Sequence, residues 1–374
     1  TAAADPSRAA RRLLKDLRAE FRHMRADTIG PELATRRVIL SQVLRSRAVR
    51  QAVRKEMSDR NVTRRDALRT ARKHALEIAA DYSHAFVRVM DRALTWLWTR
   101  LYDGVDVRNA ERLDHLPVGC EVVYVPCHRS HMDYLLLSYV IYYRGYAVPY
   151  VAAGVNLNLP VIGRYLRKGG AFFIRRSFRG ASMYPIVFMK YVDVMLGRGH
   201  PLEFFIEGGR SRTGKILTPK LGMLGGIVRA FLGGVRRDLY LVPVSIHYGR
   251  IAEESAYDAE LSGAKKQKES FGALLKARSV LKQRHGTVYV SFAEPMSLRE
   301  TLGERLGRFS EGQNDPVVQE EQRRFVQKLG FRILHEVNEA AVVGATSLSS
   351  TVLLSSSEER RVGKECRSRW SPYH

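Results

Sequence analysis

The sequence predicts an α/β protein in which an N-terminal helical bundle precedes a domain built on a mostly parallel sheet flanked by helices. Two observations carry this prediction. Up to about residue 110 there is almost no strand pattern, and apolar residues recur at helical spacing. From about residue 115, short β-branched runs alternate with helical stretches, an order that is typical of parallel sheets. We therefore divide the chain into residues 1–112, residues 113–345 and a tail, residues 346–374.

The N-terminal region is expected to form helices over residues 9–24, 31–57 and 63–102. The faces opposite their apolar stripes are crowded with Arg and Lys. Such faces are most often ordinary solvated surface, and they also suit helices that lie on anionic lipid headgroups. The sequence leaves both interpretations open.

The domain that follows is expected to alternate strands with helices. The strands are predicted at residues 121–125, 147–151, 171–174, 202–206, 239–246 and 287–292, and helices between them at residues 134–141, 182–196 and 220–232. In parallel sheets ligands collect at the carboxyl ends of the strands, so we look for a site there. The tail is serine-rich and then basic without apolar periodicity, and we leave it out of the fold prediction as low-complexity or non-native sequence.

Composition narrows the class of protein. The chain has 374 residues with 45% hydrophobic content, enough for a sizeable core. It carries 62 Lys and Arg against 38 Asp and Glu, a formal net charge of +24. This excess favours an acidic partner, whether nucleic acid, an anionic membrane or an anionic substrate, and charge alone does not choose among them.

Cysteine usage and hydropathy point to a reducing compartment and a peripheral protein. Cys120, Cys127 and Cys366 show neither metal-ligand spacing nor an even disulfide framework. No run approaches the roughly 18 to 20 apolar residues that span a bilayer, so membrane contact is expected to be peripheral. No signal peptide is recognised, and the start at Thr1 without a methionine suggests a fragment.

The most informative segment is residues 127–133, where His128 and Asp133 follow an apolar strand. A neutral imidazole takes a proton from an alcohol near pH 7, and a nearby carboxylate fixes its tautomer and stabilises the imidazolium. Asp133 also fits a capping box with Ser130, which is the structural alternative. His131 is the rival base, but it is expected inside the first helical turn, so we favour His128 in the preceding loop.

Cys127 beside His128 is a weaker candidate for a Cys/His nucleophile pair, because adjacent residues at a strand end point in opposite directions.

Two clusters of arginine follow separate predicted strands. Residues 169–176 form an apolar strand ending in Arg175 and Arg176, and residues 204–215 combine glycines with alternating arginines. Glycines let the backbone approach a ligand, and arginines clamp a phosphate with paired hydrogen bonds. Arginines at strand ends are also often simply solvated, so the sequence leaves an anion site and a solvated edge open.

The segment from Gly209 to Lys215 matches the Gly-x4-Gly-Lys part of a phosphate-binding P-loop. Ile216 stands where a Ser or Thr ligand to magnesium is required. Pro219 follows closely, and the expected helix does not open directly after the lysine. We therefore exclude a nucleotide triphosphatase.

Four blocks, residues 128–133, 170–176, 205–212 and 241–244, resemble in order and spacing those of the glycerolipid acyltransferase superfamily. The closest resemblance is to its bacterial, membrane-associated glycerol-3-phosphate acyltransferase branch, and it runs from about residue 115 to 250. Members of that branch extend further on both sides of the blocks, so we expect this chain to be a truncated product.

The resemblance implies transfer of a fatty acyl group from acyl carrier protein or coenzyme A to the first hydroxyl of glycerol 3-phosphate, the first step of phospholipid synthesis. His128 would be the general base and Asp133 would orient it. The resemblance assigns glycerol 3-phosphate binding to Arg175, Glu207, Gly208, Arg210 and Arg212, and a structural role at the site to Gly170, Gly209 and Pro243. No metal or cofactor is expected, because a thioester is already activated. Backbone amides at the start of the following helix are expected to meet the oxyanion.

The expected partners are therefore glycerol 3-phosphate, an acyl donor and an anionic phospholipid surface, and no nucleic acid. The resemblance places the protein peripherally on the cytoplasmic face of the bacterial inner membrane. Dihydroxyacetone phosphate and lysophosphatidate are the alternative acceptors, because acyltransferases for them share the same blocks. The alternative of a different class is a non-catalytic basic protein that binds membrane or nucleic acid.

Overall fold

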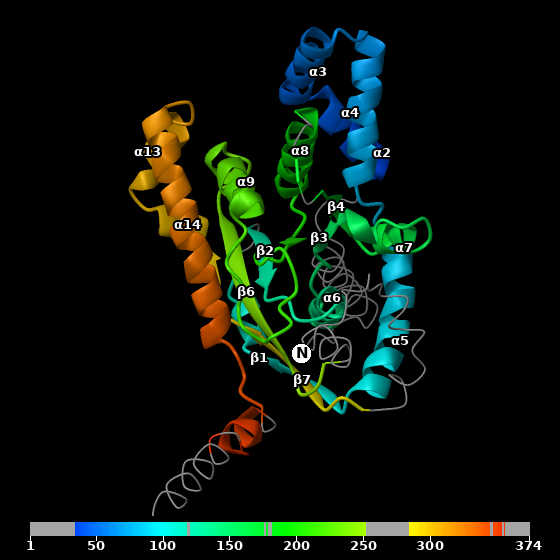
Figure 1. The fold of residues 1–374 in the computed structure, drawn as a ribbon, viewed down its shortest axis with the longest axis vertical. Helices are drawn as coiled ribbons and strands as arrows, with labels where there is room; N and C mark the ends of the chain where they lie inside the picture. Colours follow the sequence, from blue (N-terminus) through cyan, green and yellow to red (C-terminus); the bar gives the residue numbers. More distant parts are fainter. Residues whose placement is uncertain are drawn as a thin grey trace, which may run out of the picture.

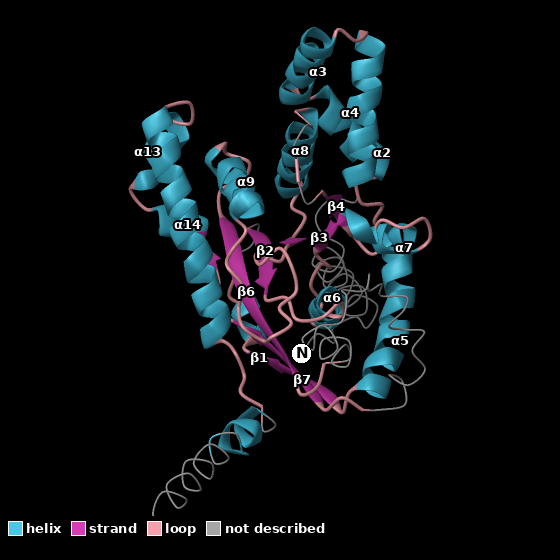
Figure 2. Cartoon of the chain, viewed as in Figure 1, coloured by secondary structure: helices cyan, strands magenta, loops and turns pink. Residues whose placement is uncertain are grey.

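The computed structural model describes residues 34–117, 120–175, 177–178, 182–251, 284–344, 347–353 and 355. Within these residues a central sheet stands between helices, and a group of N-terminal helices adjoins one side of it (Figure 1, Figure 2). The α/β class, the mostly parallel sheet and the N-terminal helices predicted from the sequence are confirmed.

The helices are α2 (Arg36–Arg45), α3 (Arg47–Arg60), α4 (Arg64–Ile78), α5 (His84–Leu101), α6 (Asp133–Tyr143), α7 (Ile162–Lys168), α8 (Met183–Gly197), α9 (Leu221–Leu232), α12 (Leu298–Leu302), α13 (Arg305–Glu311) and α14 (Pro316–Glu339). The strands are β1 (Gly104–Arg108), β2 (Glu121–Pro126), β3 (Tyr150–Gly154), β4 (Phe172–Ile174), β5 (Leu202–Glu203), β6 (Leu239–Tyr248), β7 (Thr287–Phe292) and β8 (Met296–Ser297). All of the strands predicted after residue 115 are present, with ends displaced by at most three residues.

The sheet has the order β1-β7-β6-β2-β5-β3-β4, and β8 pairs with β6 outside this path. β2 lies parallel to both β6 and β5, so its carboxyl end falls in the middle of the sheet edge. Only the pairs that β6 forms with β7 and with β8 are antiparallel among the described strands. The central position of β2 places the turn after it among neighbouring loops.

Alternation along the strands divides the hydrophobic core in two. Val123 and Val125 belong to one cluster, which includes residues of α8 and α9. Tyr124, between them, belongs to a second cluster, which includes residues of α5 and α6. The sheet is therefore covered on both faces, as its parallel strands require.

The N-terminal helices pack on α8. Ala67, Ala71 and Ala75 are almost fully buried on α4, which contacts α2, α3 and α8, and their small side chains allow close approach of these helices. The single helical stretch predicted over residues 31–57 is two helices, because Ser46 ends α2 and its hydroxyl caps α3 by accepting the amide of Val49.

The structure adds two strands that the sequence did not predict, the short β8 beside β6 and β1 at the edge of the sheet. β1 lies inside the region expected to be helical, and it pairs in parallel with β7 from Gly104 opposite Thr287 to Arg108 opposite Ser291. Its alternation is short, and its partner is far away in sequence.

The predicted helix over residues 9–24 lies outside the described residues. Among the helices that are described, none is long and apolar enough to cross a bilayer.

An ion pair ties the helical region to the edge strand β4. The guanidinium of Arg175, just after β4, donates to both carboxylate oxygens of Glu77 on α4, at 2.7 Å each. It also lies 4.3 Å from the ring centroid of Tyr184. The hydrogen bond from Arg175 lowers the pKa of Glu77 below its ordinary value.

This pair makes stability sensitive to acid. Because the pKa of Glu77 is lower in the folded state, the unfolded chain binds more protons near the ordinary glutamate pKa of about 4.3. The contribution is complete above that value and is lost as the pH falls through the folded-state pKa. We expect Glu77→Gln to lower the free energy of unfolding at pH 7 and to flatten its decline on acidification, measured by urea unfolding. Glu320→Gln, on the exposed surface of α14, is the control; equal pH slopes in the parent and Glu77→Gln would contradict the assignment.

Candidate active site

The candidate site lies at the turn between β2 and α6. β2 ends at Pro126 and α6 begins at Asp133, so the intervening loop stands at the carboxyl end of a central parallel strand. The loop after β5 and the end of β6 flank it. Ligand sites of open parallel sheets are found at this edge.

The two residues singled out from the sequence are in contact. His128 Nδ1 lies 2.9 Å from Asp133 Oδ2, and the exposed fraction is 16% for the His128 side chain and 0% for Asp133. Since the carboxylate accepts from Nδ1, the proton resides there and the lone pair is on Nε2. This is the arrangement of an oriented general base.

Asp133 is held by three further donors. Its Oδ2 accepts the backbone amides of Arg129 at 2.6 Å and Ser130 at 2.9 Å. Its Oδ1 accepts the hydroxyl of Tyr248 at 2.7 Å. A fully buried carboxylate is costly unless its oxygens are satisfied, and here both are. The capping and catalytic interpretations of Asp133 therefore describe one arrangement, in which the same carboxylate binds the turn and the imidazole.

The rival candidates fit less well. Asp133 pairs with His128, whereas His131 is buried, with a relative exposure of 9%, and lies in the turn before α6 and not in its first helical turn as expected. Cys127 is 1% exposed, and its sulfur accepts the amide of Ile246 at 3.1 Å. Burial raises the pKa of the Cys127 thiol to about 12, so the nucleophilic thiolate does not form near neutral pH.

The third block wraps around His128. Glu207 Oε1 accepts the amide of His128 and Oε2 accepts the amide of Leu217, both at 2.9 Å. The amide of Ser211 donates to the His128 carbonyl at 2.8 Å. The ring of Phe205 stacks on the imidazole with centroids 4.0 Å apart. Glu207 thus joins two loops, a role that the sequence did not specify.

Glycine and proline positions shape these loops. Gly208 has φ +65°, and a Cβ there would lie 2.7 Å from Lys220 Cγ, so glycine relieves both backbone strain and crowding. Gly170 has φ +102° for the same backbone reason, whereas a Cβ on Gly209 would meet nothing within 4 Å. Pro243 lies opposite Val125 in the β2–β6 ladder. Gly170 and Gly208 thus set the backbone conformation at their positions, and substrate binding by Gly208 stays a prediction.

The arginines separate into two groups. Arg210 and Arg212 flank Ser211 in the loop bonded to His128, so they belong to the site. Arg175 follows β4, which is separated from β2 by β5 and β3, and it is paired with Glu77. The structure therefore places the backbone of two of the three predicted arginines next to His128.

The helix geometry after the glycine-rich segment differs from that of a P-loop. α9 begins only at Leu221, well beyond Lys215. No helix opens directly after the lysine, as the sequence indicated.

Two buried polar residues near Asp133 were not singled out from the sequence. Tyr248 lies 115 residues from Asp133 in the chain, and only the pairing of β6 with β2 brings them together. Glu203 is fully buried on β5, opposite Tyr124 and Val151. Burial, reinforced by the charge of Asp133, raises the pKa of Glu203 well above its usual range, so this carboxyl is neutral. No local pattern marked either residue.

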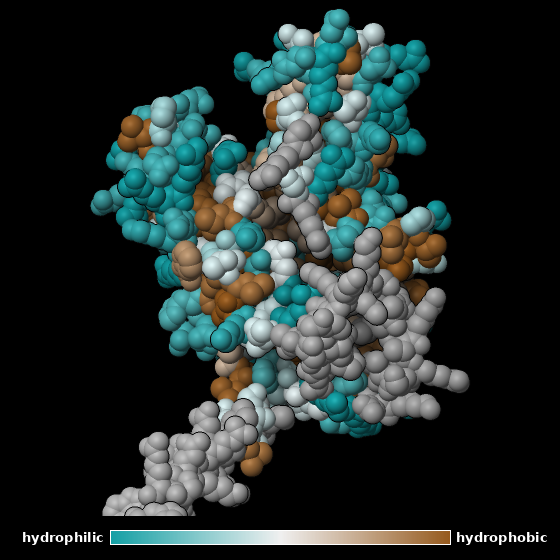
Figure 3. All heavy atoms as spheres, viewed as in Figure 1, coloured by the Kyte–Doolittle hydropathy of each residue, from teal (hydrophilic) through white to brown (hydrophobic). Residues whose placement is uncertain are grey.

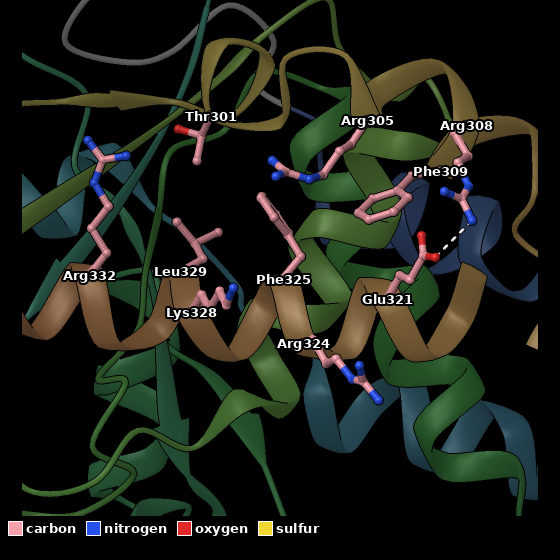
Figure 4. Close-up of a pocket in the computed structure, with 10 residues that line it drawn as sticks. All are labelled: Thr301, Arg305, Arg308, Phe309, Glu321, Arg324, Phe325, Lys328, Leu329 and Arg332. Carbon is pink, nitrogen blue, oxygen red and sulfur yellow. Dashed lines mark hydrogen bonds and ion pairs between the residues drawn. The ribbon is translucent and has the colours of Figure 1, made fainter. Parts of the chain in front are cut away.

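A second feature of the described surface is a basic cavity between α12, α13 and α14 (Figure 4). Phe309, Phe325 and Leu329 form apolar walls, and Figure 4 shows the two phenylalanine rings between α13 and α14. Its charged lining residues are Arg305, Arg308, Arg324, Lys328, Arg332 and Glu321. None of the site residues described above lines it.

Comparison with known proteins agrees with this geometry. The acyltransferase family matches residues 104–247, and the family described as the glycerol-3-phosphate acyltransferase C-terminal region matches residues 257–369. The fold and the oriented His128–Asp133 pair thus define an acyltransferase-type protein. Curated relatives are more specific, since proteins named glycerol-3-phosphate acyltransferase are 42% identical to this chain over most of its length.

Three relatives illustrate the match, each named glycerol-3-phosphate acyltransferase. The protein from Pseudomonas syringae pv. tomato is 42% identical over 340 residues, covering 91% of this chain and 41% of the relative. That from Shewanella frigidimarina is 42% identical over 362 residues, covering 94% and 44%. That from Pseudomonas aeruginosa is 42% identical over 344 residues, covering 92% and 41%. The chain therefore spans less than half the length of these relatives.

Among solved structures, the 1-acyl-sn-glycerophosphate acyltransferase PlsC from Thermotoga maritima aligns with a TM-score of 0.36 and 20% identity, covering 78% of this chain and 87% of that chain.

The Tyr248 contact can be tested through stability. Tyr248→Phe removes a donor and leaves Asp133 Oδ1 buried without it, so we expect the free energy of unfolding to fall by about 1–3 kcal/mol. Tyr289→Phe on neighbouring β7 is the matched control, because Tyr289 contacts Arg108 and His247 through its ring. Denaturant unfolding compares the two, and an equal effect of both changes would refute the hydrogen bond.

Proposed function

We propose that this protein transfers a fatty acyl group from a thioester donor to the first hydroxyl of glycerol 3-phosphate. The observation that carries the proposal is the oriented His128–Asp133 pair, hydrogen-bonded to the loop that presents Arg210 and Arg212. A general base beside cationic side chains suits an acceptor that carries both a hydroxyl and a phosphate. The names of the relatives support this acceptor.

The chemical step follows from the imidazole geometry. His128 Nε2 takes the proton of the acceptor hydroxyl as the oxygen attacks the thioester carbonyl carbon. Asp133 stabilises the imidazolium that forms. The carbon–sulfur bond then breaks, and the imidazolium returns the proton to the leaving thiolate. The thioester supplies the activation, so the step balances without further reactants.

Three backbone amides of the turn before α6 are already engaged. The amides of Arg129 and Ser130 already donate to Asp133, and the amide of Met132 donates to the Ser130 hydroxyl. The amides of Arg129 and Ser130 therefore stabilise the catalytic carboxylate, and the amide of Met132 is bound within the turn. We assign the oxyanion to the first backbone amides of α6, so that Arg210 and Arg212 remain for the acceptor phosphate.

The arginines have distinct roles in this proposal. Arg210 and Arg212 bind the phosphate of the acceptor. Glu207 holds their loop against His128 through two backbone amides. Arg175 contributes to substrate binding only after exchanging Glu77 for phosphate, because both Glu77 oxygens now accept from it.

The base is tested by substitution. His128→Ala is expected to lower the rate of acyl transfer to glycerol 3-phosphate by about 100- to 10,000-fold, the usual contribution of a general base. The measurement is product formation by purified protein in phospholipid vesicles. His335→Ala, on the exposed side of α14, controls for loss of a histidine as such. Undiminished transfer by His128→Ala would exclude this mechanism, and a folded but inactive parent would exclude the function.

The phosphate site is tested by acceptor dependence. Arg210→Ala and Arg212→Ala are each expected to raise KM for glycerol 3-phosphate about 10- to 100-fold, the effect of losing a charged hydrogen bond, and to leave KM for the donor unchanged. Arg69→Ala on the surface of α4 is the matched control. Dihydroxyacetone phosphate and lysophosphatidate are assayed beside glycerol 3-phosphate; a higher kcat/KM for either would replace the proposed acceptor. Transfer to none of them, with salt-sensitive DNA binding, would favour the non-catalytic alternative.

The acyl donor is proposed to be acyl carrier protein or acyl-CoA. Both are anionic, and the net charge of +24 attracts either of them. The basic cavity in Figure 4 adds five cations against one carboxylate, and Arg308 pairs with that carboxylate, Glu321, at 2.8 Å. Its charge and its apolar walls complement an acidic carrier protein.

We propose that the protein acts peripherally on an anionic phospholipid surface, at the cytoplasmic face of the inner membrane. Val89 and Trp96 are exposed one heptad apart on α5, beside Arg88 and Arg92. The ring of Phe86, on α5, stacks on the exposed Tyr165 of α7. Figure 3 shows hydrophobic residues gathered over α7. Aromatic and basic side chains on one face are typical of interfacial helices.

Vesicle binding tests this surface. The double change Trp96→Ala with Tyr165→Ala is expected to weaken binding to phosphatidylglycerol vesicles about tenfold or more, because burial of one large apolar side chain is worth about 1.5–3 kcal/mol. Phe331→Ala, an exposed aromatic residue on α14, is the matched control. Equal binding by the parent, the double variant and the control would contradict this orientation.

A further inference from the structure

A groove with a volume of about 750 Å³ runs between α8, α9 and the first half of α14. We call it the α8–α9 groove. Its apolar walls include Pro185 and Met189 from α8, Leu221 and Val228 from α9, and Val326 from α14. Figure 3 shows the surface hollowed between α9 and α8. The proposed chemistry makes no use of this space, although its volume is within the range of small-molecule sites.

The groove begins beside the catalytic loops. α9 starts at Leu221, directly after Lys220, whose stem packs on Gly208 and whose amide donates to the Ile206 carbonyl at 2.6 Å. α8 is the helix that follows β4 and Arg175 in the chain. Both walls thus continue from segments that carry site residues, and the first turns of both helices lie on the side of the strands' carboxyl ends.

The glycines of α9 indicate that the groove stays open because the sequence places residues without side chains along it. A glycine in a helix interior costs about 0.5–1 kcal/mol relative to alanine, so each needs a reason. Gly226 has one, because a Cβ there would lie 2.4 Å from Met189 Sδ. Gly225 and Gly222 do not: a Cβ on Gly225 would only touch Val326 at 3.8 Å, and one on Gly222 would meet nothing within 4 Å. Packing of the protein itself does not require these two glycines, yet both line the groove.

We propose that the α8–α9 groove receives the hydrocarbon chain of the acyl donor, and that Gly222 and Gly225 keep it wide enough for a long chain. This inference rests on the proposed function. A thioester carbonyl at His128 must direct its alkyl tail away from the cationic loop, and the apolar wall of the groove begins at Leu221, close after that loop in the chain. Each methylene buried there contributes about 0.8 kcal/mol, so the groove would distinguish long from short chains. The same cavity has a polar edge formed by Arg229, Gln313, Asn314, Gln319, Gln322 and Arg323.

The test separates binding from turnover. In a His128→Ala background, which holds the donor without transferring it, we would measure the affinity for 16-carbon and 8-carbon acyl-CoA by isothermal titration below their micellar concentrations. Gly222→Phe and Gly225→Phe each fill the groove, and Gly222→Ala and Gly225→Ala are the matched controls. We expect the phenylalanine variants to lose at least tenfold in affinity for the 16-carbon donor, to keep that for the 8-carbon donor, and to leave thermal unfolding unchanged. The alanine variants should keep both affinities.

Several outcomes would overturn the groove assignment. One is an unchanged ratio of long- to short-chain affinity in both phenylalanine variants, and another is equal loss for both donors. If Gly225→Phe unfolds, Gly222→Phe decides, since its side chain enters open space. Loss of long-chain binding in a protein whose parent transfers no acyl group would support the groove while refuting the proposed function. Normal transfer with an unchanged chain-length ratio would do the reverse.

Discussion

The site depends on a single buried charge. Asp133 has no exposed surface, and its carboxylate is stabilised by the imidazole of His128, two backbone amides of the turn and the Tyr248 hydroxyl. These donors come from the end of β2, the turn before α6 and the end of β6. Removing any one of them leaves a buried acceptor less satisfied, so the carboxylate fixes three elements at once. The orientation of the general base follows from this requirement.

A second buried carboxylate organises the loop that faces the base. Glu207 accepts one amide from His128 and one from Leu217, so the loop between them is closed against the catalytic turn. Arg210 and Arg212 are carried on that loop. The cationic side chains are therefore placed by backbone hydrogen bonds to an anion that is itself buried, and they need not pair with it to be positioned. Glu203 nearby is neutral because the interior and the charge of Asp133 both oppose its ionisation. Glu203 consequently adds no negative charge beside the site.

The rest of the molecule shapes access to this centre. The N-terminal helices pack on α8 through small alanines and are tied to β4 by the Arg175–Glu77 pair. On the opposite side α14 packs along α9 and β6. The helices that line the α8–α9 groove are thus supported from both sides, and the glycines of α9 remain open to it. The basic cavity at α13 and the aromatic surface of α5 and α7 lie outside this centre, and each suits a partner of a different kind.

Local signals in the sequence determined much of the fold. Alternating β-branched runs located the strands after residue 115, since burial on both faces of a parallel sheet selects such residues. The His128–Asp133 pair was also predictable, because five residues across a strand-to-helix turn are enough to bring them together. The glycines at Gly170 and Gly208 signalled backbone that other residues adopt only with strain. Family resemblance then supplied the reaction that these patterns by themselves left open.

Only the tertiary structure decided how distant parts complete the site. Tyr248 meets Asp133 because β6 pairs with β2, and β1 joins the sheet because β7 offers it an edge. Glu77 meets Arg175 across 98 residues of sequence. Contacts of this kind produce no sequence pattern near either residue, because a polar side chain is common in its own segment. The sequence by itself determined which elements form and which base is oriented. Strand pairing and helix packing determined what surrounds that base, because those energies arise only when separated segments exclude water together.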